Sequence, residues 1–153
     1  AQYARGDALV AKLAAVMDEA VATLAKQAIM SLPPGSKIAA VATGGFGRSQ
    51  LAPLSDIDLL ILHTGLSEDA LKTFANALLY PLWDAGLVVG HAAHTPASAV
   101  KFAETDMTAM TAFLDARLVA GDAKLYSDFT SRFERLRWRT KSKFIKAKRD
   151  ELE

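Results

Sequence analysis

Apolar residues near the N-terminus recur at steps of three and four, which is the period of an amphipathic helix. The positions that follow this period are Leu9, Leu13, Val16, Met17, Ala20, Leu24 and Ile29. Pro33-Pro34-Gly35 then interrupts the pattern, so we predict a helix from Gln2 to Met30. The next apolar run, Lys37 to Thr43, is short and stops at two glycines, which predicts a buried strand.

The rest of the chain alternates between the same two kinds of pattern. We predict a short helix over residues 47–51, a strand that carries Asp56, Asp58 and the apolar run Leu59–Leu62, a helix over Glu68–Ala85 with Ser67 as N-cap, a strand over Leu87–His94, two helices between Pro96 and Gly121 that break near Thr105, and a final helix over Lys124–Glu153. Strands alternating with helices indicate an α/β fold.

The arrangement we expect is an α/β (or α+β) domain in which helices pack on one face of a small mixed sheet and helical extensions lie at both ends. We divide the chain into an N-terminal helix (1–35), a core (36–122) and a basic C-terminal helix (123–153). The opening residues lack an initiator Met and the order of a signal peptide, so we expect a segment of a longer protein.

Composition narrows the class of protein. The 153 residues carry a formal net charge of +1, with 51% hydrophobic and 23% charged residues, as expected of a globular domain with its own core. The absence of cysteine excludes disulfides, zinc–thiolate sites and thiol catalysis, and it is compatible with a reducing cytoplasm. Since no apolar run approaches the roughly 18 residues of a spanning helix, we expect no membrane segment.

The most informative chemistry lies where the glycines precede two carboxylates. Gly44 and Gly45 allow a tight turn and close approach of backbone N–H groups to phosphate oxygens, because neither has a Cβ. Asp56 and Asp58 stand at i and i+2, so on a strand both point to one face and can hold Mg²⁺. Asp56 alone reads as a turn residue, but Asp58 interrupts an apolar strand, where an unpaired carboxylate is costly.

The sequence from Gly44 onward, Gly-Gly-Phe-Gly-Arg-Ser-Gln-Leu-Ala-Pro-Leu-Ser-Asp-Ile-Asp, resembles the signature of the DNA polymerase beta nucleotidyltransferase superfamily. Within it, the wording is similar to the protein-PII uridylyltransferase / uridylyl-removing family. Trp83–Leu87, Val89–His91 and Leu114–Asp122 resemble later segments of that family, so the resemblance covers roughly residues 37 to 149.

This resemblance implies a polymerase-beta-like nucleotidyltransferase fold and transfer of UMP from UTP to a tyrosine of the nitrogen-regulatory protein PII, with Mg²⁺ as cofactor and pyrophosphate as product. It also implies a cytoplasmic protein with no membrane or nucleic-acid partner. In the family, a further helical region, an HD phosphohydrolase domain and paired ACT domains follow this segment.

Carried onto this sequence, the family's motif makes Asp56 and Asp58 the catalytic and metal-binding residues, and Gly44, Gly45, Arg48 and Ser55 the nucleotide-binding ones. Three further assignments stay open. Arg48 either pairs with a phosphate or lies on the surface, and Ser55 contacts the nucleotide or, as we favour, only its own turn. His91 is a possible accessory residue or a strand histidine without a catalytic role.

The sequence departs from the family at four positions. A carboxylate is common in the family where Val88 stands, an arginine where His94 stands, a glycine where Ser49 stands and a glutamate where Gln50 stands. The strand Leu87–His94 carries no Asp or Glu, so the third carboxylate of the superfamily is unassigned; Asp106, at a predicted helix start, reads first as a cap.

These departures keep alternatives open: nucleotidyl transfer to another protein or to a small-molecule hydroxyl, or a regulatory nucleotide-binding domain without turnover.

Two other features have ordinary explanations. Phe74 and Trp83 lie at helical spacing and are predicted in the core, whereas Phe46, inside the glycine loop, is the aromatic residue expected near the nucleotide. Nine of the 18 basic residues lie between Arg132 and Arg149 in the final helix. A solvated helix face explains them better than a phosphate or nucleic-acid site, because exposed charges are common on helices.

Overall fold

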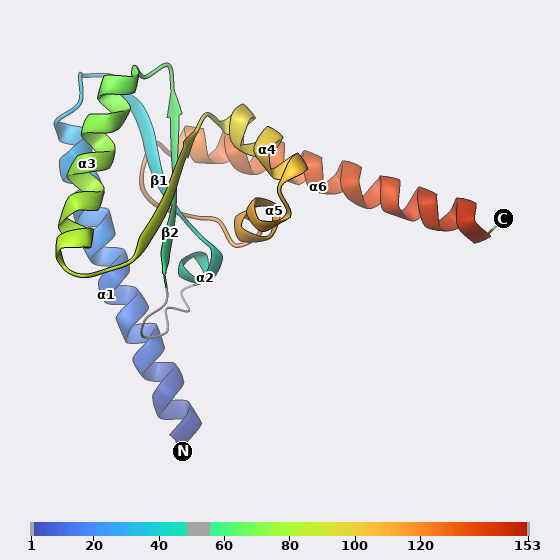
Figure 1. Ribbon diagram of the computed structural model, residues 1–153, viewed down its shortest axis with the longest axis horizontal. Helices are drawn as coiled ribbons and strands as arrows, with labels where there is room; N and C mark the ends of the chain where they lie inside the picture. The colour runs from blue at the N-terminus through green and yellow to red at the C-terminus, as the bar shows by residue number, and fades with distance from the viewer. Residues whose placement is uncertain (1, 49–55, 153) are drawn as a thin grey trace.

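The computed structural model describes residues 2–48 and 56–152, which form a four-stranded sheet with helices around it (Figure 1). In chain order the elements are α1 (Gln2–Met30), β1 (Lys37–Thr43), α2 (Gly44–Gly47), β2 (Ile57–Thr64), α3 (Glu68–Asp84), β3 (Val89–His94), α4 (Pro96–Thr105), α5 (Met107–Phe113), β4 (Arg117–Gly121) and α6 (Ala123–Leu152). The predicted α/β class is therefore confirmed, and the two predicted helices that break near Thr105 are α4 and α5.

The strands lie in the order β3-β2-β1-β4. β1 pairs antiparallel with both β2 and β4, whereas β2 pairs parallel with β3, so the sheet is mixed, as expected. Because β2 is the neighbour of both β1 and β3, the start of β2 lies between the end of β1 and the start of β3. In the register, Asp58 on β2 lies beside Thr43 of β1 on one side and Gly90 of β3 on the other.

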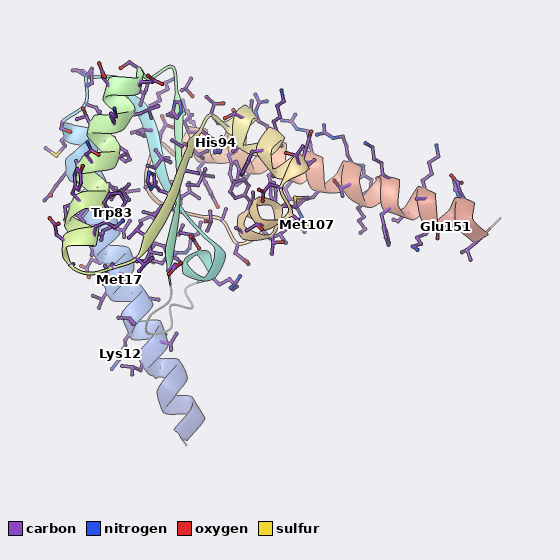
Figure 2. The ribbon with its side chains drawn as sticks, in the orientation of Figure 1. Lys12, Met17, Trp83, His94, Met107 and Glu151 are labelled. Carbon is purple, nitrogen blue, oxygen red and sulfur yellow. The ribbon has the colours of Figure 1, made fainter. Side chains whose placement is uncertain are left out.

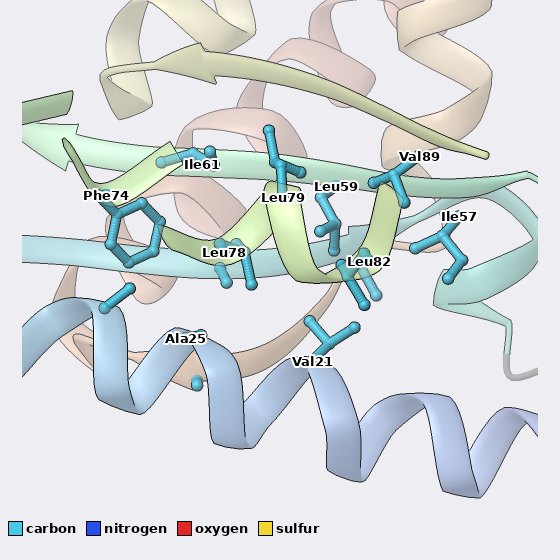
Figure 3. Packing of buried hydrophobic residues seen from close by; sticks show 14 of the residues in the cluster. Val21, Ala25, Ile57, Leu59, Ile61, Phe74, Leu78, Leu79, Leu82 and Val89 are labelled. Atoms are coloured by element: carbon cyan, nitrogen blue, oxygen red, sulfur yellow. The ribbon is translucent and has the colours of Figure 1, made fainter. Parts of the chain in front are cut away.

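One face of the sheet packs against α1 and α3 (Figure 3). Alternate residues of β1 and β2 point to this face, because side chains alternate along a strand. Phe74 of α3, predicted in the core, is fully buried there and contributes to a cluster with the adjacent leucines of its helix. The cluster includes Val21, Ala25, Ile38, Ala40, Ala42, Ile57, Leu59, Ile61, Leu78, Leu79, Leu82 and Val89.

The opposite face is covered as well, by α4, α5 and α6, so the expectation of helices on one face only was wrong. The reason lies in the strands: the residues between those of the first cluster, such as Val41 and Leu60, are also apolar and buried. A strand that is apolar on both sides must be covered on both sides. Phe113, Phe129 and Phe133 pack edge-to-face and stacked in this second cluster.

Local sequence sets where several helices begin. The Ser67 hydroxyl accepts the Ala70 N–H at the start of α3, as predicted, and Thr95 with Ser98 forms a capping box at the start of α4. Such caps satisfy N–H groups that have no partner within the helix. They fix the directions in which α3 and α4 leave the sheet.

The sequence pattern does not predict the strand β4, because its apolar residues continue the helical block that precedes it. Leu118, Val119 and Ala120 form too short a run to distinguish a strand from a helix by periodicity. Gly121, which ends the strand, has φ +111°, and a Cβ there would collide with the Ile38 carbonyl oxygen. The chain can therefore leave the sheet at this point only because the residue is glycine.

The last helix, α6, packs on the sheet only through its first half and then extends away from it (Figure 1). Beyond Leu136 its side chains are exposed along the whole helix, as around Glu151 in Figure 2. Arg132, Arg137 and Lys148 form exposed ion pairs with neighbouring acids of the same helix. This supports the solvated-face interpretation. In the part of the chain described, no helix is both long and apolar enough to cross a bilayer.

His63, near the end of β2, has a partly buried imidazole. Among the described residues, its Nδ1 is buried without a hydrogen-bond partner, and burial, with a smaller contribution from His94, lowers its pKa below the usual 6.5. A lowered pKa in the folded state means that, as pH falls below about 6.5, the unfolded chain binds the proton first. Stability at neutral pH is therefore lost on acidification through this window.

We predict that replacing His63 with Gln reduces this loss, because the variant has no imidazole to protonate. The measurement is the free energy of unfolding by urea between pH 7.5 and pH 5. Parallel curves for wild type and His63→Gln would show that His63 does not contribute to the pH dependence.

Candidate active site

The two aspartates singled out in the sequence lie at one corner of the sheet. Asp58 is the second residue of β2, and Asp56 immediately precedes that strand and is exposed. Ile57, between them, points into the core. Since alternate residues share a face, the neighbours of Ile57 are directed away from that core. The corner therefore combines one exposed and one half-buried carboxylate.

Two glycines surround the Asp58 carboxylate. Gly44 has φ +59°, and a Cβ built on it would lie 3.3 Å from Asp58 Oδ2; a Cβ on Gly90 would lie 2.9 Å from Oδ1. Side chains at these positions would occupy the space around the two oxygens. The structure thus brings Gly44 and Asp58 together, as predicted, and adds Gly90, which had been noted only as part of a segment.

The electrostatics of this corner disfavour a bare negative charge. The pKa of Asp58 is raised above its usual 3.8, first by burial and second by the nearby charge of Asp56. Two carboxylates that oppose each other's ionisation are stabilised together by a bound cation. In residues 2–48 and 56–152, no group of three or more His, Asp or Glu side chains could hold a metal ion. A cation here would therefore need ligands from a substrate as well.

A hollow of about 480 Å³ opens beside this corner. It is bounded by β2 and β3 and by the helices α4 and α5, and its polar lining includes Thr43, Asp58, His91, His94 and Asp106. Asp106 accepts the Ala109 N–H at 2.9 Å, so it caps α5 as expected, yet it also lines the same hollow as Asp58. The hollow is large enough for part of a nucleotide or for an incoming side chain.

The remaining predicted site residues have different surroundings. Arg48 forms an exposed ion pair with Asp115 at 2.7 Å, which fits the surface interpretation. Gly45 lies within α2, partly exposed. Ser55 lies outside the described residues, as do the substituted positions 49 and 50. His91 is exposed on β3, with its ring 6.0 Å from that of Trp83.

Three expectations about this region need correction. The short helix after the glycines spans Gly44–Gly47 rather than beginning at residue 47, because the glycine pair itself makes the helical turn. Phe46 is completely buried, so it cannot stack openly on a base. Trp83, expected in the core, is 39% exposed and donates its Nε1–H to the Val89 carbonyl at 3.4 Å (Figure 2).

Arg117, the first residue of β4, holds the glycine turn in place, a role that the sequence did not reveal. Its Nη2 donates to the Phe46 carbonyl at 2.7 Å and its Nε to the Gly47 carbonyl at 3.1 Å. The guanidinium also forms a two-point ion pair with Asp18 of α1, at 2.7 and 2.9 Å, and lies over the Phe46 ring. One side chain thus joins α1, α2 and β4.

All three guanidinium nitrogens of Arg117 donate hydrogen bonds in this arrangement. Arginine donates in a fixed plane to a carboxylate and to carbonyl oxygens at once, which lysine cannot do. The last carbonyls of a helix have no donor within its regular hydrogen-bond ladder, and Arg117 donates to those of Phe46 and Gly47. Asp18 and Arg117 are 99 positions apart in the chain, so no local spacing in the sequence could have indicated the pair.

No family model matches the chain. It is 40% identical over 149 residues to the bifunctional uridylyltransferase/uridylyl-removing enzyme of Bradyrhizobium diazoefficiens, which covers 93% of this chain and 16% of that protein. It is 42% identical over 120 residues to the protein of the same name from Nitrobacter winogradskyi, covering 78% of this chain and 13% of that protein.

A third protein of this name, from Aromatoleum aromaticum, is 41% identical over 99 residues, which are 65% of this chain and 12% of that protein. The resemblance read from the sequence is therefore confirmed, and these relatives are named as enzymes. The chain spans about one-sixth or less of their length.

Among solved structures, a toxin–antitoxin with AMP-PNP aligns with 86% of this chain and 94% of its own, at 11% identity and a TM-score of 0.47. A similarity this low says nothing about function.

We predict that Asp58→Asn raises the melting temperature at neutral pH in the absence of metal, because it removes a half-buried charge. The pKa of Asp58 is higher in the folded than in the unfolded chain, so its ionisation costs stability as pH rises through the folded value. The gap between variant and wild type should therefore widen from pH 4 to pH 7. Asp150→Asn, on the exposed end of α6, is the control; a lower melting temperature for Asp58→Asn would contradict the prediction.

We also predict that Arg117→Met lowers the free energy of unfolding by about 2–3 kcal/mol, because it leaves two carbonyls and the Asp18 carboxylate without their donor. Arg132→Met, which breaks an exposed pair with Asp128, should cost less than about 1 kcal/mol. Urea denaturation measures both. Equal losses in the two variants would show that Arg117 is only a surface cation.

Proposed function

We propose, with this similarity as the premise, that the chain is the nucleotidyl-transferring segment of an enzyme that moves UMP from UTP to a tyrosine hydroxyl of PII. The observation that supports this most strongly is the corner in which Gly44 and Gly90 leave the Asp58 carboxylate open, with Asp56 beside it. The resemblance and the absence of cysteine also favour a cytoplasmic location.

The donor atoms at this corner fit Mg²⁺. The ion prefers oxygen ligands and is commonly bound by one or two carboxylates together with substrate phosphates. Asp56 and Asp58 would supply the carboxylates, and the raised pKa of Asp58, caused by burial and by the charge of Asp56, supports the proposal of a cation there. When bound, Mg²⁺ neutralises phosphate charge and supports in-line transfer.

The chain's own groups then have distinct tasks. We assign the triphosphate to the Gly44–Gly45 turn, where missing side chains let backbone N–H groups approach phosphate oxygens. Arg117 positions this turn through the carbonyls of Phe46 and Gly47. The hollow beside Asp58 leaves room for an acceptor side chain.

The reaction balances as a substitution at phosphorus. The acceptor oxygen forms a bond to the α-phosphorus of UTP while the bond from that phosphorus to the bridging oxygen breaks. Pyrophosphate leaves with the electron pair, and the hydroxyl proton passes to solvent. The protein contributes position and charge rather than a covalent intermediate.

A second candidate is a nucleotide-binding domain without turnover. Over the described part of the chain, two carboxylates stand at the corner without a third on β3, where Gly90 faces Asp58. Transfer to another hydroxyl, on a different protein or a small molecule, is a variant of the first candidate. Binding and transfer must therefore be measured separately.

We predict that the chain binds UTP more tightly than ATP, GTP or CTP, and only with Mg²⁺. Asp56→Asn and Asp58→Asn should each weaken this binding by at least about tenfold, since they remove metal ligands. Asp84→Asn, at the exposed end of α3, is the matched control and should bind as wild type. Calorimetric titration of each nucleotide, with and without Mg²⁺, gives the result.

The transfer itself is followed with radiolabelled UTP and PII. Label on PII with wild type but not with Asp58→Asn would support the enzyme. Mg²⁺-dependent binding without label on PII or on another acceptor would favour the regulatory domain, and unchanged binding in Asp58→Asn would place the nucleotide elsewhere.

A further inference from the structure

β3 is an open edge of the sheet. It is the first strand in the order β3-β2-β1-β4, and its middle residues, Gly90 to Ala93, are all exposed (Figure 1). At the other edge, α1 contacts β4, Arg117 ties that strand to α1 and α2, and Arg117 to Val119 are half-buried. Among the described residues, β3 is therefore the more exposed of the two edges.

The backbone of β3 offers free hydrogen-bonding groups. Ile57 N–H on β2 donates to the Val88 carbonyl, which points inward, whereas the Val89 carbonyl accepts from the Trp83 side chain outside the sheet. In a parallel pair, only every second residue of a strand bonds to its neighbour. The backbone N–H and C=O groups of His91 and Ala93 therefore point away from β2, as the Val89 carbonyl does. Among the described residues, neither makes a backbone bond outside the sheet ladder.

Nothing in the sequence of β3 protects this edge. Proteins usually block an exposed edge with a charged side chain, a proline or a bulge. Val-Gly-His-Ala-Ala-His has no lysine, acid or proline, and its pairing with β2 runs in unbroken register. An unprotected edge of small residues is typical of strands that bind another extended segment.

Hollows lie on both faces of this edge. On the side of Asp58 is the hollow of about 480 Å³ that reaches α4 and α5. On the other side, a hollow of about 440 Å³ is lined by His91 and Ala93 and by Leu71 and Lys72 of α3. Successive side chains of a strand point to opposite faces of the sheet. A strand added to β3 would therefore direct every second side chain into one hollow and the remaining ones into the other.

Gly90 connects the edge to Asp58. Asp58 Oδ1 would lie 2.9 Å from a Cβ on Gly90, so the carboxylate reaches over β3 toward the open side. A further strand would lie about 4.8 Å beyond β3, and its residue opposite Gly90 would point to the same face as Asp58. A side chain as long as tyrosine spans that separation.

We propose that the open edge of β3 binds an extended segment of the acceptor protein as a fifth strand, and that this pairing presents the acceptor hydroxyl to Asp58. The inference rests on the proposed function and names how the protein substrate is held. A small-molecule acceptor would have no use for the edge, so the free His91 and Ala93 groups favour a polypeptide.

The first test removes one outward N–H. Ala93→Pro eliminates the donor and places a ring at the edge, at a position where proline is tolerated because the inward bonds to β2 remain. With PII as acceptor, kcat/KM should fall about tenfold, mainly through KM, since a ladder bond and close approach are lost. UTP affinity should not change, and Ala93→Ser, which keeps the N–H, should have a KM for PII well below that of Ala93→Pro.

The second test does not depend on turnover. Addition of unmodified PII should slow hydrogen exchange at the His91 and Ala93 amides, while Gly90 and Ala92, whose amides already bond to β2, change little. Exchange that slows on α6 instead, or nowhere, would overturn the inference.

The outcomes separate the two levels of the proposal. If wild type transfers no UMP, the proposed function fails, and amide protection by PII still decides the docking. If wild type transfers UMP and Ala93→Pro does so equally well, the docking inference fails alone. Sedimentation that shows wild type as a dimer and Ala93→Pro as a monomer would make the edge a self-pairing surface and overturn it as well.

Discussion

The site depends on one half-buried carboxylate that no cation of the described chain neutralises. Asp58 is fixed by strand β2, and burial together with Asp56 raises its pKa. Gly44 and Gly90, on the two neighbouring elements, keep side chains away from its oxygens. A partly buried charge without an oppositely charged partner lowers the stability of the folded protein. Binding of a cation together with an anionic substrate would raise that stability again.

The surrounding structure holds this corner rigid although the unpaired charge is unfavourable. Both faces of the sheet are packed, so β1 and β2 cannot shift to shield the charge. Arg117 ties the end of α2 to α1 and so restricts the motion of the glycine turn. β3 lies on the open side, where its residues Gly90 to Ala93 are small or exposed and leave the same carboxylate uncovered.

Periodicity predicted most helices and strands because the apolar faces are regular, and it placed Asp58 on a strand beside the glycine turn. It missed β4, since a run as short as Arg117–Gly121 does not distinguish a strand from the end of a helix. It also missed the pairing of Arg117 with Asp18 and the closeness of Gly90 to Asp58, which arise from strand order and from contacts distant in sequence. Local pattern carries no information about such contacts.

The proposed function requires that the metal–triphosphate binds at the Asp58 corner. Paramagnetic Mn²⁺ in place of Mg²⁺, added with UTP to isotope-labelled protein, reports this position directly through the broadening of nearby amide resonances. We expect selective broadening at Gly44, Gly45, Asp58 and Gly90, with loss of the effect in Asp58→Asn. Broadening centred on the basic residues of α6, or unchanged in Asp58→Asn, would contradict it.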